Sequence, residues 1–123
     1  MPREPLKIPC RVESLSILAP DGQVDKALEP QLSDTDLLRL YRTMRLSRRY
    51  DERCLQLQRQ GRMGTYGPSK GQEAASLGVA YAMQPNDWFV PTFRETAGLL
   101  WRGWPPANGM LVWGGHEAGN VMP

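Results

Sequence analysis

The chain has 123 residues, of which 41% are hydrophobic and 23% are charged, and its formal net charge is +2. That length is enough for one domain core, and the composition excludes a chain that is disordered throughout. The small net charge does not favour a nucleic-acid-binding protein. No stretch approaches the roughly 20 apolar residues of a membrane span, and the first ten residues lack the apolar run of a secretory signal. We therefore expect a soluble, cytoplasmic protein that binds neither nucleic acid nor membrane.

The two cysteines, Cys10 and Cys54, indicate neither a disulfide framework nor a zinc site. They do not form a Cys-x-x-Cys pair, and they have no Cys/His spacing suited to zinc. Reduced thiols are typical of cytoplasmic proteins. The sequence therefore predicts no metal site made by this chain.

Residues 1–32 are predicted to form an extended N-terminal arm. Five prolines in this stretch each remove a backbone donor and disfavour helix in the preceding residue. Residues 12–18 alternate in polarity, which predicts an edge strand, and Asp21-Gly22 predicts a turn after it. Such an arm has little core of its own, so we expect it to order against a partner or a larger subunit.

A long helix is predicted to begin at Ser33. Ser33 is a favourable N-cap, and Asp36 three residues later completes a capping pair near the positive end of the helix dipole. Apolar residues then recur at helical spacing until Gly61, which is placed to end the helix. A helix of about 28 residues would be about 42 Å long. That is too long for a small core, so we expect its apolar stripe to face a larger body or another subunit.

The second half of the chain is predicted to alternate short helices with glycine-rich loops. A second helix over residues 71–83 carries small residues on one face (Ala74, Ala75, Gly78 and Ala82), and we expect that face to be buried. Residues 88–90 form a short apolar run before Pro91, typical of the first strand of a buried parallel sheet. Helices over residues 95–102 and 106–113 follow. A single strand needs partners, so the chain is expected to be part of a larger structure.

Arg94, just after the predicted strand, is the first candidate for chemistry. Ligands of open α/β sheets sit at the carboxyl ends of strands, and an arginine can hold a phosphate through two charge-assisted hydrogen bonds. From spacing alone, a surface arginine paired with Glu95 or Asp87 is the favoured interpretation.

Two further candidates have simpler explanations. His116 lies in a glycine-rich loop with only Glu117 nearby, which favours a solvated histidine over a general base. Glu73 in a first helical turn complements the helix dipole, and this favours a helix-start role over catalysis. The chain also lacks the common dinucleotide, P-loop, nucleophile-elbow and zinc-protease motifs.

Several short motifs occur in a distinctive order: RQGR at 59–62, GQEA at 71–74, Asp87, the pair Phe93-Arg94, and Arg102-Gly103. In order and spacing, residues 33–123 resemble the alpha subunits of thiamine-diphosphate-dependent 2-oxo acid dehydrogenases. The segment before GQEA is more similar to the bacterial enzymes built from separate alpha and beta chains. In another branch, a histidine that reaches the substrate stands at about the position of Gly67.

The resemblance implies an α/β fold class. Residues 33–123 would be the truncated, N-terminal helical part of a thiamine-diphosphate-binding domain, with its parallel sheet incomplete in this chain. Phe93 and Arg94 would contact thiamine diphosphate. The family aromatic is usually tyrosine, so Phe93 lacks a hydroxyl donor. The family's Gly-Asp-Gly and Asn motif for Mg²⁺ is absent, and the resemblance assigns no catalytic residue here.

The resemblance also implies a function. The complete enzyme would be a component of the pyruvate dehydrogenase complex, which decarboxylates pyruvate oxidatively and passes the acyl group to a lipoyl group. Its partners would be a beta subunit, in a heterotetramer, and a lipoyl-bearing acyltransferase component. We expect this chain alone to be inactive. The alternatives are a branched-chain 2-oxo acid dehydrogenase alpha subunit, or a catalytically silent interaction module that docks through the first helix.

Overall fold

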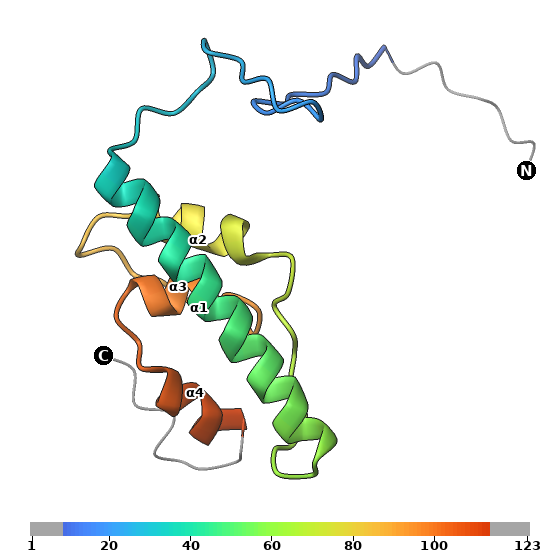
Figure 1. Cartoon of the computed structure of the whole chain (residues 1–123), viewed down its shortest axis with the longest axis vertical. Coiled ribbons are helices and arrows are strands. Elements are labelled where there is room, and N and C mark those ends of the chain that lie inside the picture. Colours follow the sequence, from blue (N-terminus) through green and yellow to red (C-terminus); the bar gives the residue numbers. More distant parts are fainter. Residues whose placement is uncertain (1–8, 114–123) are drawn as a thin grey trace, which may run out of the picture. The chain divides into compact units, whose positions relative to one another are not determined.

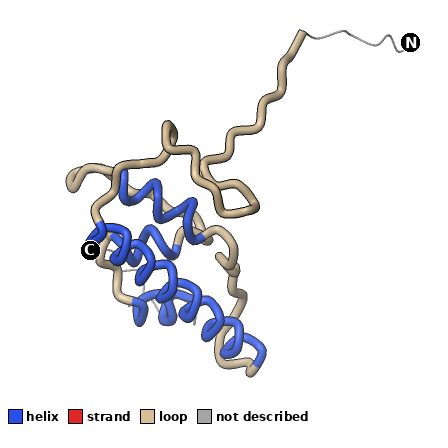
Figure 2. The backbone as a smooth tube through the Cα atoms, turned by 45° about the horizontal axis from the view of Figure 1, so that its top comes forward, coloured by secondary structure: helices blue, strands red, loops and turns tan. Residues whose placement is uncertain are grey.

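The structure, a computed structural model, describes residues 9–113 of the chain. Its four helices are α1 (Asp34–Arg59), α2 (Glu73–Ala82), α3 (Thr96–Trp101) and α4 (Pro106–Trp113) (Figure 1). The chain divides into two compact units between Leu32 and Ser33, and all four helices belong to the second unit. Within residues 9–113 there are helices and loops but no strand (Figure 2).

The first unit is built around one tight turn rather than a strand. Leu18 and Val24 form an isolated antiparallel bridge, and Gly22 turns the chain with a φ of 88°. The backbone N–H of Asp25 donates to the carbonyl of Ile17 at 2.8 Å. The predicted turn is confirmed, but the predicted edge strand over residues 12–18 is wrong. One bridge is too short a ladder to hold that segment as a strand.

Helix α1 begins and ends where its capping residues predict. The Ser33 hydroxyl accepts the backbone N–H of Asp36 at 3.1 Å and donates to the Asp36 carboxylate at 2.8 Å. At the other end Gly61 has a φ of 68°, and the backbone N–H of Arg62 donates to the Leu57 carbonyl at 3.0 Å. Both termini therefore satisfy groups that a helix leaves unpaired.

The buried face of α1 starts only at its second half. Ser47, Tyr50, Asp51 and Cys54 are buried at helical spacing, and the cluster of Tyr50, Cys54, Met63 and Tyr66 forms a hydrophobic core. Three apolar residues near the N-terminal end of the helix remain about half exposed: Leu37, Leu38 and Tyr41. The described part of the chain thus leaves part of the predicted apolar stripe without cover.

Helices α2 and α3 pack against each other through Leu77, Ala80 and Ala97, each 1% exposed. The predicted burial of the small residues of α2 is wrong, because the helix turns Leu77 inward and leaves Ala74, Ala75, Gly78 and Ala82 exposed. Burying leucine removes more apolar area from water than burying alanine does.

Residues 88–90 do not form the predicted parallel strand. They have no regular secondary structure. Trp88 is 91% exposed and Val90 is 83% exposed, while Phe89 lies partly buried against α3 near Gly98. A strand exists only when its backbone groups pair with a neighbour. Residues 9–113 supply no neighbouring strand to this segment.

Gly98 of α3 is in close contact with the Phe89 ring and with the backbone of α2. A Cβ at this position would lie 2.5 Å from Phe89 Cζ and 3.0 Å from the Ser76 carbonyl oxygen. Substituting Gly98→Ala should therefore lower the free energy of unfolding by about 1–3 kcal/mol through overpacking. Gly78, on the open face of α2, has nothing within 4 Å of its Cβ position. Gly78→Ala should raise the stability by about 0.5–1 kcal/mol through helix propensity. Urea unfolding followed by circular dichroism measures both, and equal effects of the two variants would contradict this packing.

Candidate functional site

The loop that carries Arg94 is held by one carboxylate. The Glu95 side chain accepts the backbone N–H groups of Thr92 at 2.8 Å and Arg94 at 3.1 Å, and the Thr92 hydroxyl at 2.9 Å. Burial alone would raise the pKa of Glu95, but these hydrogen bonds hold it below its usual value. Glu95 is thereby committed to the loop immediately before α3, which fixes the backbone of Arg94.

The Arg94 guanidinium lies beside the Phe93 ring, 5.4 Å from its centroid. It lines a pocket of about 330 Å³ together with Gln72 and Phe89. Residues 9–113 contain three side-chain ion pairs, and Arg94 takes part in none of them. The ion pairs of Arg94 with Glu95 or Asp87 that the sequence favoured are therefore not formed in this part of the chain, and the Asp87 carboxylate accepts the backbone N–H of Gln84 at 2.7 Å. Among residues 9–113, the Arg94 side chain is exposed and forms no ion pair.

Phe93 brings the loop before α2 against the Arg94 loop. A Cβ at Gly67 would lie 2.7 Å from Phe93 Cδ2, so the ring covers the glycine. Any side chain at position 67 would have to displace the Phe93 ring. Gly67 and Phe93 therefore lie on one surface, although 26 positions separate them in the sequence.

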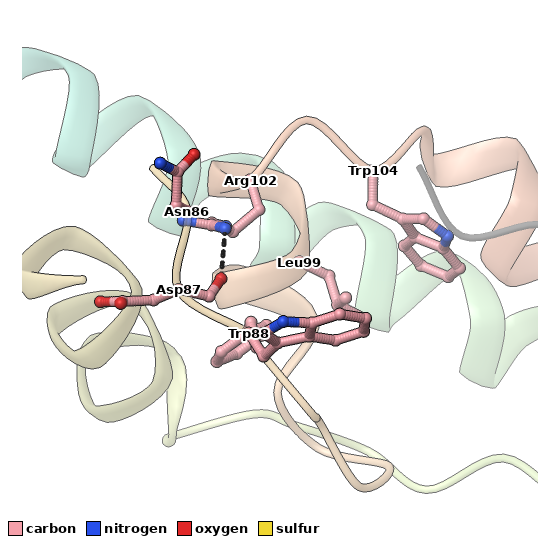
Figure 3. A pocket seen from close by; sticks show the side chains of 7 residues that line it. Asn86, Asp87, Trp88, Leu99, Arg102 and Trp104 are labelled. Atoms are coloured by element: carbon pink, nitrogen blue, oxygen red, sulfur yellow. Dashed lines mark hydrogen bonds between the residues drawn. The ribbon is translucent and has the colours of Figure 1, made fainter. Parts of the chain in front are cut away.

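Arg102 is a structural residue of the same region. Its guanidinium donates to the carbonyl oxygens of Gln84 at 3.0 Å, Pro85 at 3.1 Å and Asp87 at 2.8 Å. Figure 3 shows Arg102 reaching from α3 to the turn that contains Asp87, beside a pocket of about 370 Å³ lined by Trp88, Leu99 and Trp104. The sequence placed Arg102 in a motif but did not indicate this role. Through these three hydrogen bonds to carbonyls, the guanidinium fixes the start of the segment that leads to Arg94.

A buried carboxylate on α1 holds the loop before α2. Asp51 is fully buried, and its Oδ1 accepts the Tyr66 hydroxyl at 2.9 Å, the Ser69 backbone N–H at 2.6 Å and the Ser69 hydroxyl at 3.1 Å. Burial, together with the hydrogen bond to Asp51, raises the pKa of Tyr66, which keeps its hydroxyl a donor. The sequence analysis missed this network. The available signal was a charged residue at a buried helical position between Ser47 and Cys54.

A second carboxylate ties α2 to α1. Glu73 is 4% exposed and accepts Arg48 Nε at 2.5 Å and the Gly71 backbone N–H at 2.8 Å. The hydrogen bond from Arg48 lowers the pKa of Glu73, although burial alone would raise it. Glu73 does stand in the first turn of α2, as predicted, and it also anchors that turn to the long helix.

His116 lies outside the described residues. Within residues 9–113 no group of three or more His, Cys, Asp or Glu side chains could hold a metal ion. No helix in the described part of the chain is long and apolar enough to cross a membrane.

Replacing Asp51 should destabilise the fold. Asp51→Ala removes the acceptor of three buried hydrogen bonds, and each unsatisfied buried donor costs about 1–3 kcal/mol. We expect a loss of at least that size in the free energy of unfolding, measured by urea denaturation. Glu52→Ala changes the neighbouring exposed carboxylate and should shift stability by less than about 0.5 kcal/mol. Similar values for both variants would contradict a structural role for Asp51.

Glu73 should make stability depend on pH. Its pKa is lowered in the fold, so its charged form stabilises the protein above the unfolded pKa of about 4.3. This contribution disappears as the pH falls through the folded value. The thermal midpoint of Glu73→Gln should therefore lie well below that of the parent at neutral pH, and the two midpoints should converge at acidic pH. Glu52→Gln is the exposed control. A difference that stays constant with pH would exclude this explanation.

Comparison with known proteins places these features in a family. Residues 41–122 match the family described as Dehydrogenase E1 component. The chain is 48% identical over 100 residues to the pyruvate dehydrogenase E1 component subunit alpha of Acholeplasma laidlawii, covering 81% of this chain and 29% of the relative. It is 40% identical over 117 residues to the same subunit of Bacillus cereus, covering 94% of this chain and 32% of the relative. The Staphylococcus epidermidis subunit is 38% identical over 114 residues, covering 92% of this chain and 31% of the relative.

The chain spans about a third of the length of these relatives. The match includes the long helix from Tyr41 onward, the loop before α2, and the Phe93-Arg94 pair. The chain therefore belongs to the family of dehydrogenase E1 components.

Proposed function

We propose that this chain forms the N-terminal part of an alpha subunit of a pyruvate dehydrogenase E1 component. The observation that carries the proposal is its identity of 48%, 40% and 38% with three proteins of that name. The complete assembly would decarboxylate pyruvate oxidatively and transfer the acyl group to a lipoyl group. Because the chain spans about a third of its relatives, that activity belongs to the assembly and not to these residues alone.

Within this function, Arg94 would hold the diphosphate of thiamine diphosphate. The fit rests on a guanidinium that is exposed, takes part in no ion pair among residues 9–113, and stands on a loop braced by Glu95. A planar guanidinium can give a phosphate two parallel hydrogen bonds. Phe93 would form an apolar wall beside it, and Gly67 leaves room for that ring.

Magnesium would be held by residues outside the described part of the chain. A diphosphate needs a divalent cation to neutralise most of its charge, and residues 9–113 contain no group of three or more His, Cys, Asp or Glu side chains that could hold a metal ion. When bound, thiamine diphosphate supplies the electron sink that the removal of carbon dioxide from a 2-oxo acid requires. This chain's own residues would bind and orient it.

A beta subunit would complete the site and cover exposed apolar surface, and a lipoyl-bearing acyltransferase component would receive the product. Leu37 and Tyr41 remain about half exposed at the N-terminal end of α1. An apolar helix surface of this kind is typical of a face that another chain or domain covers.

The role of Arg94 can be tested by calorimetry. Thiamine diphosphate with Mg²⁺ is titrated into the full chain alone and into the chain mixed with an E1 beta subunit. We expect weak binding by the chain and tighter binding by the mixture. Arg94→Ala should weaken binding by about 10- to 100-fold, because a hydrogen bond to a charged group is worth about 1.5–3 kcal/mol.

Arg62→Ala, which removes another exposed charge from a different loop, should leave the affinity unchanged. Parent-like binding by Arg94→Ala would remove Arg94 from the site. If the mixture forms a complex but binds no cofactor, the chain would instead be a silent interaction module.

A further inference from the structure

The outward face of α1 carries a stripe of arginines. Arg42, Arg45, Arg49 and Arg53 are all exposed, and we call them the arginine stripe. At 100° per residue they fall on the side of the helix opposite the buried face of Ser47, Tyr50, Asp51 and Cys54. None of the four can therefore turn into the core of this unit.

The spacing of the arginines in the stripe lowers the stability of the helix. Arg45, Arg49 and Arg53 repeat every four residues, and like charges at that spacing destabilise an isolated helix. The ion pairs among residues 9–113 include none of the four; the nearby Arg48 uses its Nε for Glu73. Glu52 is the one carboxylate close to the stripe on its own helix, and it forms no ion pair in this part of the chain.

Apolar surface accompanies these charges. Leu38 and Leu46 are 55% and 48% exposed and flank the stripe along α1. On one side Arg45 and Arg49 border a recess of about 420 Å³. Tyr41 and Met44 line it together with the Arg48, Glu52 and Glu73 side chains. Arginine together with apolar side chains is typical of protein–protein contacts. A surface for a nucleic-acid backbone would not need the exposed leucines, and the net charge of +2 is too small for one.

We propose that the arginine stripe is a docking surface for an acidic amphipathic helix of another protein. The repeat of Arg45, Arg49 and Arg53 is about 6 Å along the axis, which is four residues at the helical rise. Carboxylates that repeat every four residues on a partner helix have the same spacing. The partner's apolar residues would cover Leu38 and Leu46. Binding relieves the repulsion within the stripe because each guanidinium gains a carboxylate. This surface is separate from the Phe93-Arg94 loop and does not depend on cofactor binding.

The test uses the full chain and a fluorescently labelled helical peptide with glutamates every four residues beside leucines. Fluorescence anisotropy measures binding of this peptide, of its Glu-to-Gln counterpart, and of a short DNA duplex. We expect the acidic peptide to bind at least 10-fold more tightly than the other two probes, with an affinity that falls as salt rises.

The triple variant Arg45→Gln, Arg49→Gln, Arg53→Gln should weaken peptide binding at least 10-fold. The control triple variant Arg59→Gln, Arg62→Gln, Lys70→Gln removes the same charge elsewhere and should bind as the parent does. The stripe variant should also melt at the same temperature as the parent or higher, because repulsion is relieved. The proposal is overturned by equal binding of the two triple variants, by preference for DNA, by absence of peptide binding, or by a lower melting temperature of the stripe variant.

Discussion

The buried carboxylate of Asp51 is the constraint on which this part of the protein depends. It accepts three hydrogen bonds on one oxygen, and through them it fixes Tyr66 and Ser69 to the long helix. A carboxylate without a cationic partner is costly to bury, so its donors must be held in place. The loop before α2 is thereby positioned on α1, and Gly67 within that loop receives the Phe93 ring. The surface beside Arg94 therefore depends on Asp51, a residue of α1 that lies far from Arg94 in the sequence.

Arg48, Arg102 and Arg94 differ in the acceptors that lie near them, and these acceptors decide what each arginine binds. Arg48 is held by the Glu73 carboxylate, and Arg102 is held by three carbonyl oxygens of one turn. Arg94 has its backbone N–H fixed by Glu95 while its guanidinium stays outside every ion pair of residues 9–113. An arginine whose backbone is fixed and whose side chain is free is well suited to bind an anionic ligand. This contrast supports the proposed role of Arg94 more than its exposure does.

Membership of the dehydrogenase E1 family also accounts for surface that residues 9–113 leave uncovered. Trp88 and Val90 are almost fully exposed, and Leu37, Leu38 and Tyr41 are half exposed. The relatives are about three times as long as the stretch that matches this chain. Exposed aromatic and aliphatic residues are expected wherever the remaining fold or another subunit packs.

The sequence alone determined the helices and their ends. Ser33 and Gly61 act through local capping and backbone geometry, so both ends of α1 could be placed from neighbouring residues. The ordered motifs also identified the family. The pairing of the 88–90 segment, the buried face of α2 and the partners of Asp51, Glu73 and Arg102 could not be read in this way. These features depend on contacts between segments that are far apart in the sequence. In α2, for example, Leu77 is buried against α3 and the small residues remain exposed. Only the tertiary structure decides such contacts, because burial and hydrogen bonding between distant segments are not local properties of the sequence.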